Sequence, residues 1–431
     1  MAKVLMSAFA CRPGAGSEPG IGWNFATHAA TDHDVWVLTR PDNRESIEKY
    51  VNTDTSGAFA RLKFVYVPFG KIAGKLPGKL THVKYAMWQK NAARAAQQLH
   101  AEIGFDIAHH VTYGCYWQSS GLHKLEGISF VWGPVGGGES TPRGLLSALP
   151  TVGVLKERTR DITRWAGECS GGVKRTADRA TIGLATTQET ADRMKALGVK
   201  RVEVFTAMGL TAKDLDGLSS MPTASNAGLN GALNVVSVGR LLDWKGFNLG
   251  LQAFAKANLP AGSKYIIIGD GPAMGHLRQV AAELNLGDNV HFAGHLPREK
   301  AMELLATAHA LAHPSLHDSG GWVVLEAMAM GKPVVCLELH GPQLMVSEET
   351  GIRVPATTPG QVVTDLAAAF SKLAADSDLV ERMGNAGRQR VKDVFSWESR
   401  RSELNRLYDE LTGKDAPTIG RETTKPPRVA V

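Results

Sequence analysis

Two carboxylates flank the start of an apolar helix in the stretch from His313 to His340, and their spacing carries the clearest chemical signal in the chain. Asp318 precedes the glycine pair Gly320 and Gly321, and Glu326 follows Asp318 by eight residues, which is about two helical turns. Backbone N–H groups in the first turn of a helix have no intrahelical partner, and the helix dipole adds partial positive charge there. Such a terminus can bind a phosphate group or the hydroxyls of a sugar.

An ordinary structural role is the alternative for both acids. Asp318 could cap the helix, and Glu326 could be a solvated helical side chain. For such a pair in isolation we favour this interpretation, so the rest of the chain has to decide between the two.

The length of the chain and the spacing of its cysteines limit the classes of protein to which it can belong. With 431 residues the chain exceeds one typical hydrophobic core, which predicts two domains. Four cysteines without CxxC spacing argue against a zinc site or a disulfide framework and favour a reducing compartment. The first apolar run is too short for a signal peptide, and no run reaches membrane-spanning length. We therefore expect a cytoplasmic protein.

The whole chain has a net charge of +6, and its positive charge is concentrated in one segment. No acidic residue occurs between Thr55 and Ala101. The aromatic residues in this segment are Phe64, Tyr66, Phe69, Tyr85 and Trp88. The cationic residues interleaved with them are Arg61, Lys63, Lys71, Lys75, Lys79, Lys84, Lys90 and Arg94. This Arg61–Arg94 stretch predicts a surface for an anionic membrane, at its inner face, or for a phosphorylated acceptor. A solvated face over ordinary core aromatics is an equal alternative. Nucleic acid is not expected, because no recognised binding module accompanies the charge.

Strands and helices alternate in two series, which predicts two parallel sheets with both faces covered. The first series fills residues 1–210, with one helix expected over 158–179, and the second fills residues 232–396. Residues 211–231 are small and polar, so we expect a linker there, and a disordered tail over 413–431. The expected fold class is α/β with two doubly wound domains.

Two glycine-rich loops and a histidine pair follow strands of the first series. The loop at 11–22 lacks clean GxGxxG spacing, so a dinucleotide site is a weak hypothesis. Three glycines at 136–138 beside Glu139 are hard to explain by packing alone, which favours a ligand-facing loop. His109 and His110 end another strand, and strand alternation prevents both from facing the same side.

In this order the segments resemble a GT-B glycosyltransferase, and more narrowly the retaining family 4 transferases (glycosyl transferase group 1). The resemblance covers nearly the whole chain. It rests on Val238-Gly-Arg-Leu241 with Lys245-Gly246, on Gly269-Asp-Gly-Pro272, on Gly294-His-Leu296, on the stretch from His313 to His340, and on Phe395-Ser-Trp-Glu398. The resemblance implies two Rossmann-like domains facing a central cleft, the first completed by a C-terminal helix at about 397–412.

A donor site in the second domain is the main implication of the resemblance. The family's E-x7-E motif maps onto Asp318 for the donor sugar and Glu326 for the ribose, although Asp318 is one methylene shorter than the usual Glu. Arg240 and Lys245 match the two cations on the diphosphate. The other donor-side positions are Gly16, Gly239, His295, Leu296, Ser319, Gly320, Gly321 and Trp322.

The resemblance also places residues in the first domain. A histidine after the strand at 105–111 contacts the donor sugar in the family, which implies His109, or His110 with a shifted register. A buried, hydrogen-bonded histidine is the alternative. The acceptor-side positions are Glu18, Gly137, Gly138 and Glu139.

Together these matches predict an enzyme, a metal-independent retaining glycosyltransferase without a cofactor. It would move a hexose from a UDP- or GDP-linked donor to a hydroxyl of a glycan, glycolipid or phosphorylated acceptor, in polysaccharide or glycolipid biosynthesis. Arg240 and Lys245 would balance the charge that grows on the leaving diphosphate, and Asp32-His-Asp34 is expected to form a turn rather than a metal-binding DxD motif. The alternatives are a nucleotide-sugar-binding protein with weak or no transfer, which only Asp318 supports, and an NAD-dependent oxidoreductase using the loop at 11–22.

Overall fold

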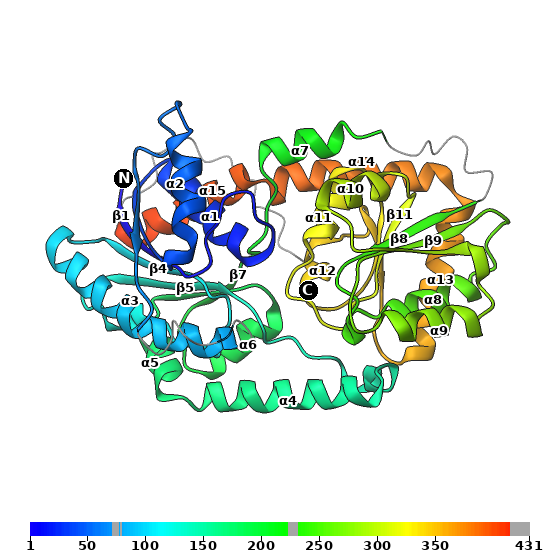
Figure 1. The fold of residues 1–431 in the computed structure, drawn as a ribbon, viewed down its shortest axis with the longest axis horizontal. Helices are drawn as coiled ribbons and strands as arrows, with labels where there is room; N and C mark the ends of the chain where they lie inside the picture. The colour runs from blue at the N-terminus through cyan, green and yellow to red at the C-terminus, as the bar shows by residue number, and fades with distance from the viewer. Residues whose placement is uncertain (71–76, 78–79, 223–231, 414–431) are drawn as a thin grey trace. The chain divides into compact units, whose positions relative to one another are not determined.

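The computed structural model describes residues 1–70, 77, 80–222 and 232–413, and it divides into two compact units (Figure 1). The first unit contains residues 1–138, 162–207 and the chain from Trp397 onward. The second contains residues 139–161 and 208–396. The predicted tail after Gly413 lies outside the described residues. Of the predicted linker, residues 223–231 also lie outside them, and α7 (Ala212–Ser219) occupies its first part.

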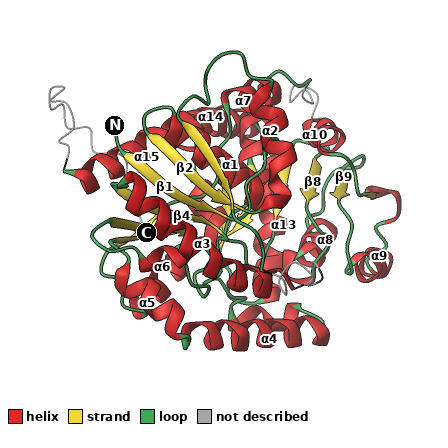
Figure 2. Ribbon diagram, turned by 60° about the vertical axis from the view of Figure 1, so that its left-hand side comes forward, coloured by secondary structure: helices red, strands yellow, loops and turns green. Residues whose placement is uncertain are grey.

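The first unit is built on a parallel sheet whose described strands lie in the order β3-β2-β1-β4-β5-β6-β7. Figure 2 shows β1, β2 and β4 side by side, as the register of β1 with both neighbours requires. The strands are β1 (Lys3–Ala8), β2 (Asp34–Thr39), β3 (Leu62–Tyr66), β4 (Ile107–Thr112), β5 (Ser129–Val135), β6 (Ile182–Ala185) and β7 (Val202–Val204).

Alternating apolar residues place one helical layer on each face of this sheet. Val4, Met6 and Ile107 pack toward α1, α2 and α15, whereas Leu5 and Ala108 pack toward α3, α5 and α6 (Figure 1). These helices are α1 (Ser17–Ala30), α2 (Arg44–Asn52), α15 (Trp397–Thr412), α3 (Thr81–Ile103), α5 (Gly171–Arg179) and α6 (Gln188–Ala196). Helix α15 belongs to the first unit because its apolar side chains, such as Tyr408, lie in that core.

The second unit repeats the plan with the order β10-β9-β8-β11-β12-β13, again parallel throughout its described strands. Val235 and Ile267 face α8, α9 and α13, and Val236 and Ile266 face α7, α10, α11 and α14. The strands are β8 (Asn234–Val238), β9 (Lys264–Ile268), β10 (Val290–Gly294), β11 (Ala310–His313), β12 (Val334–Leu337) and β13 (Gly351–Val354). The helices are α8 (Phe247–Lys256), α9 (Met274–Glu283), α10 (Arg298–Ala306), α11 (Trp322–Ala329), α12 (His340–Met345), α13 (Pro359–Ala375) and α14 (Ser377–Phe395). Both units are therefore doubly wound, as the sequence predicts.

Residues 139–161 group with the second unit, although they were expected in the first domain. Leu145 and Leu149 lie in the core beneath α8 and α13, and Asn248 donates a hydrogen bond to the Ala148 carbonyl at 3.0 Å. The helix expected over 158–179 is two helices, α4 (Thr151–Glu168) and α5, and the chain passes from the second unit to the first within α4.

The aromatic residues of the Arg61–Arg94 stretch are partly core residues. Tyr85 and Trp88 are fully buried on the inner side of α3, whereas Lys90 and Arg94 are exposed on its outer side. Lys63 lies over the Trp36 ring at 4.4 Å from its centroid. The described part of this surface is therefore cationic without exposing Tyr85 or Trp88, and Lys71, Lys75 and Lys79 lie outside the described residues.

Candidate active site in the second unit

The strand order of the second sheet reverses between β8 and β11, and several of the predicted donor residues lie in the two loops that follow these strands. In doubly wound domains, ligands bind at the carboxyl ends of the strands at this switch point. We call residues 239–246 the β8 loop and residues 314–321 the β11 loop. The β8 loop carries Arg240 and Lys245, and the β11 loop carries Asp318.

The two loops lie in direct contact, and a glycine permits it. Gly246 adopts φ +67°, and a Cβ atom at this position would lie 2.0 Å from the Pro314 carbonyl oxygen. The Leu316 N–H donates to the Trp244 carbonyl at 2.8 Å. Since no larger residue fits at position 246 without moving the β11 loop, the Lys245-Gly246 pair of the sequence motif has a packing reason.

Asp318 is held by three groups. Its Oδ2 atom forms an ion pair with Lys245 Nζ and lies 3.2 Å from His313 Nε2, and its Oδ1 atom accepts from the Gly320 N–H at 3.4 Å. Burial acts to raise the pKa of Asp318, but the Lys245 ammonium and His313 hold that pKa well below its usual range. Asp318 is therefore ionised at neutral pH and can only accept hydrogen bonds.

Helix α11 begins at Trp322, and its N-cap is Gly321 with φ +144° and no side-chain cap. Asp318 is thus not the N-cap, and the ordinary structural interpretation of that residue is wrong. Its carboxylate instead points toward Lys245 and His313. The Ser319–Trp322 amides, predicted to meet the donor sugar, lie at the start of this eight-residue helix.

Glu326 lies on α11 with only 6% of its surface exposed, so it is not a solvated helical side chain. Arg298, the first residue of α10, donates to Glu326 Oε1 from Nε at 3.0 Å and from Nη2 at 2.8 Å. Burial raises the pKa of Glu326, and the Arg298 charge opposes that effect. Both bonds use the same oxygen, so Arg298 fixes the orientation of the carboxylate.

The remaining donor-side positions are distributed around these loops. Gly239 follows β8 with φ +154°, Arg240 is exposed, and His295 is exposed in the turn between β10 and α10. Leu296 is half-buried against the core that contains α11. Their contacts with a donor stay predictions.

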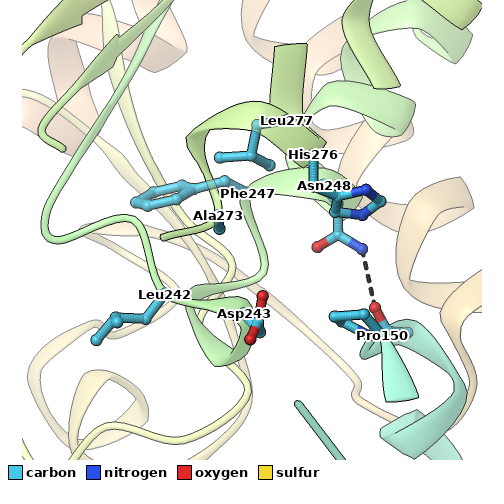
Figure 3. A pocket seen from close by; sticks show the side chains of 9 residues that line it. Pro150, Leu242, Asp243, Phe247, Asn248, Ala273, His276 and Leu277 are labelled. Carbon is cyan, nitrogen blue, oxygen red and sulfur yellow. Dashed lines mark hydrogen bonds between the residues drawn. The ribbon is translucent and has the colours of Figure 1, made fainter. Parts of the chain in front are cut away.

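The small pocket in Figure 3 is not large enough for a donor. It has a volume of about 10 Å³ and is lined by residues of the β8 loop, α8, α9 and the 139–161 segment, including Asp243, Asn248 and Pro150. A space of this size holds about one water molecule. It therefore shows how closely the 139–161 segment packs beneath the β8 loop.

The first unit has a polar group at its own switch point, between β1 and β4. Glu18, in the first turn of α1, accepts a hydrogen bond from the Gly114 N–H just after β4. Burial raises the pKa of Glu18 to about 7, while Gly114 and the Arg40 charge oppose the rise. Gly16 is the N-cap of α1 and is exposed, so the predicted acceptor-side Glu18 and donor-side Gly16 lie together at the N-terminus of α1.

The two histidines of β4 are both fully buried and point to opposite faces of the sheet. His109 Nε2 lies 2.6 Å from the Gly133 carbonyl oxygen and Nδ1 lies 2.5 Å from the Tyr408 hydroxyl. His110 packs against Tyr85, and its Nε2 lies 3.1 Å from the Tyr113 carbonyl oxygen. Burial lowers the pKa of His109 to about 3 and that of His110 to about 4, so both rings are neutral. Both histidines therefore have the arrangement of the alternative interpretation, a buried and hydrogen-bonded histidine.

Packing accounts for two of the three glycines at 136–138. A Cβ atom on Gly137, at φ +97°, would lie 2.1 Å from the Trp117 ring, and one on Gly138 would lie 2.5 Å from the Thr190 backbone. Packing therefore explains Gly137 and Gly138 without a ligand, and the ligand-facing role of this loop stays a prediction. Glu139, predicted on the acceptor side, is buried and belongs to the second unit.

Asp32 belongs to a turn of the first unit, as its sequence context predicts. Arg401 donates to it from Nε at 2.5 Å and from Nη2 at 2.8 Å, which ties the turn to α15. Across the described ranges, no three His, Cys, Asp or Glu side chains come together as a metal site would require. Metal independence itself stays a prediction.

Arg298 is the clearest residue that the sequence analysis did not identify. An arginine at the first position of a helix opposes the helix dipole, which is a signal that the residue serves an acidic partner. Glu157 and His317, which pair within this unit at 2.9 Å, have no comparable signal because 160 positions separate them.

Comparison with known proteins matches most of the second unit to the family that the sequence motifs resemble. Residues 227–390 match the model for glycosyl transferases group 1. A 2-deoxystreptamine glucosyltransferase of Streptomyces kanamyceticus is 26% identical over 260 residues, which cover 59% of this chain and 64% of that protein. The lipopolysaccharide core biosynthesis glycosyltransferase LpsE of Rhizobium meliloti is 29% identical over 222 residues, 50% of this chain and 60% of LpsE. The match thus spans less than two thirds of either relative.

Solved structures extend the similarity to the whole fold. Sucrose-phosphate synthase from Thermosynechococcus elongatus superimposes with a TM-score of 0.64 at 20% identity, covering 96% of this chain and 100% of that one. Anabaena HepE in complex with UDP gives a TM-score of 0.61 at 16% identity, covering 95% and 100%. At these identities the likeness concerns the fold. Two doubly wound units and the similarity to these structures lead to one conclusion: the chain has the two-domain GT-B fold, and its residues 227–390 match the family of glycosyl transferases group 1.

Proposed function

We propose that this protein transfers a hexose from a UDP- or GDP-linked donor to an acceptor hydroxyl, with retention of configuration and without a metal ion. The observation that carries the proposal is the contact between Lys245 and Asp318 at the β8–β11 switch point. It places a cation and an ionised acceptor side by side, where a sugar diphosphate needs one group for its phosphates and one for its hydroxyls.

In the proposed reaction, the bond between the sugar C1 and the diphosphate oxygen breaks, and both electrons go to the leaving oxygen. Lys245 and Arg240 stabilise the charge that develops on that oxygen. The acceptor oxygen bonds to C1 on the same face, and its proton passes to the departing phosphate. Asp318 orients the sugar by accepting from its hydroxyls, and Glu326, oriented by Arg298, accepts from the ribose.

The acceptor is proposed to be a glycan, a glycolipid or a phosphorylated molecule in polysaccharide or glycolipid biosynthesis. The name of the LpsE relative and the exposed cations of the Arg61–Arg94 stretch support this class. We propose a cytoplasmic protein that associates with an anionic inner membrane surface through this stretch. In the part of the chain that the structure describes, no helix has the length and apolarity needed to span a bilayer. Flotation with anionic liposomes tests the association, and a protein that stays wholly unbound would argue for a soluble acceptor.

The decisive experiment measures hydrolysis and transfer with a panel of UDP- and GDP-sugars for the wild type and for Arg240→Ala, Lys245→Ala and Glu326→Ala. We expect the two cation variants to lose about 10²- to 10³-fold in turnover, because each removes a charge that acts on the leaving group. Glu326→Ala should weaken donor binding. Unchanged turnover in all three variants would disprove the site assignment. Calorimetric binding of a donor without any turnover would instead favour a nucleotide-sugar-binding protein.

A further inference from the structure

A buried histidine–glutamate pair adjoins both loops of the donor site and has no role in the proposed reaction. His317 lies in the β11 loop, immediately before Asp318, and Glu157 lies on the part of α4 that belongs to the second unit. His317 Nε2 and Glu157 Oε1 are 2.9 Å apart, and each side chain is only 8% exposed.

The contacts of this pair define which atoms carry the protons. A carboxylate can only accept, so His317 donates from Nε2, and its Nδ1 atom faces Arg160 Nη1 at 3.4 Å. Burial lowers the pKa of His317, which keeps the ring neutral. Burial acts to raise the pKa of Glu157, but His317, Arg160 and Thr141 hold it at about 2. The result is a neutral imidazole fixed between a carboxylate and a guanidinium.

The His317 ring also stacks on Trp244 of the β8 loop, with ring centroids 5.1 Å apart and planes inclined by 17°. Trp244 immediately precedes Lys245, just as His317 immediately precedes Asp318. The two stacked rings therefore join the loops one residue before the two side chains that form the ion pair.

The far side of the pair is anchored by the 139–161 segment. The Thr141 hydroxyl donates to Glu157 Oε2 at 3.0 Å, so both oxygens of Glu157 are engaged. Ser315 adds a link within the site, since its hydroxyl donates to the His317 carbonyl at 3.1 Å. A hydrogen-bonded chain thus runs from Thr141 through Glu157 to the His317 ring, and ring stacking continues it to Trp244.

We propose that Glu157 and His317 are positioning residues that hold Lys245 and Asp318 in the geometry needed for transfer, an inference that rests on the proposed function. Neither residue touches substrate. Glu157 fixes the orientation and tautomer of His317, and His317 fixes the β8 loop through Trp244. A displacement of about 1 Å at reacting groups can cost about 10²-fold in rate, so a support of this kind has a measurable effect.

The test compares His317→Phe with Glu157→Gln. Phenylalanine keeps the ring for stacking on Trp244 but removes both hydrogen bonds, so we expect kcat to fall about 10- to 100-fold. Glutamine keeps an oxygen that accepts from His317 Nε2, so Glu157→Gln should stay within about threefold of wild type while Glu157→Ala falls like His317→Phe. Initial rates are measured at saturating donor, on samples whose folded fraction is established by circular dichroism.

His309→Phe is the matched control, because His309 is equally buried in the same unit and, among the described residues, its ring nitrogens form one hydrogen bond, which Nδ1 accepts from the Asn234 N–H at 2.9 Å. It should keep the wild-type kcat. A wild-type kcat in His317→Phe would overturn the proposal, as would an equal loss in His309→Phe or in Glu157→Gln. If His317→Phe does not fold, Thr141→Val replaces it, with an expected loss of about threefold; an unchanged kcat there overturns the proposal.

A wild-type protein that transfers no sugar would refute the proposed function without deciding this inference. In that case the binding of UDP and GDP, measured by calorimetry, is the readout. His317→Phe should weaken nucleotide binding about tenfold and His309→Phe should not. Equal affinities in the two variants would overturn the positioning role.

Discussion

Lys245 and Asp318 form an ion pair although they lie 73 positions apart in the sequence. Each follows the strand that flanks the switch point of the second sheet, and the close approach of the loops at Gly246 brings them together. Ligands of doubly wound domains bind at this switch point, so the pair connects the fold to the proposed chemistry.

The ion pair predicts a pH-dependent contribution of Asp318 to stability. Its pKa is held below the ordinary value by Lys245 and His313, so its contribution is complete above about pH 4 and is lost as the pH falls toward the lowered pKa. Asp318→Asn should therefore be less stable than wild type at pH 7, and the difference should shrink below about pH 4. Denaturant unfolding at several pH values measures it. A difference that does not depend on pH would contradict the ionic origin.

Glu18 predicts a contribution to stability that depends on pH in the opposite direction. Burial raises its pKa from the ordinary 4.5 to about 7, so the folded state holds a proton that the unfolded state releases, and stability falls as the pH rises between these values. Glu18→Gln keeps an oxygen for the Gly114 N–H and should melt at a higher temperature than wild type at pH 8 but not at pH 4. Equal melting temperatures at pH 8 would show that the carboxyl titrates normally.

Glycine substitutions separate packing from ligand approach. Gly137→Ala should lower the free energy of unfolding by about 2–4 kcal/mol, because its Cβ meets the Trp117 ring and its φ is positive. Gly16→Ala meets no atom within 4 Å and has φ −81°, so it should change stability by only about 0.5 kcal/mol.

Gly16→Ala should nevertheless reduce donor turnover about tenfold if the backbone of that loop approaches the donor. Chemical denaturation and initial rates on the same samples distinguish the two effects. Wild-type turnover in Gly16→Ala would remove Gly16 from the predicted donor-side residues.

We expect His109 to contribute to the stability of the folded state. His109→Phe removes the partners of the Tyr408 hydroxyl and the Gly133 carbonyl, so we expect a loss of about 2–4 kcal/mol in the free energy of unfolding. Tyr408→Phe is the control and should cost about 1 kcal/mol, because it removes one hydroxyl only. Equilibrium unfolding gives both values. A His109→Phe protein of wild-type stability with lost turnover would instead assign His109 to the donor sugar, as the resemblance implies.

Treatment with EDTA tests the predicted metal independence. We expect transfer to keep its rate after exhaustive chelation, since Arg240 and Lys245 are proposed to supply the charge that a metal would provide. Initial rates before and after chelation, with Mg²⁺ and Mn²⁺ added back, decide the question. A loss of activity that either ion restores would refute the prediction.

The sequence by itself determined the α/β class, the two series of strands and helices, the positions of Asp318 and Lys245 in loops, and the position of Glu326 on a helix. Apolar periodicity and glycine motifs are local properties, so they can be predicted from nearby residues. Only the tertiary structure decided which distant side chains meet. It paired Glu326 with Arg298 and His317 with Glu157, and it placed the 139–161 segment in the second unit. It also showed that Trp117 and Thr190 enclose Gly137 and Gly138. These relationships depend on close packing between segments far apart in the chain, which no local pattern records.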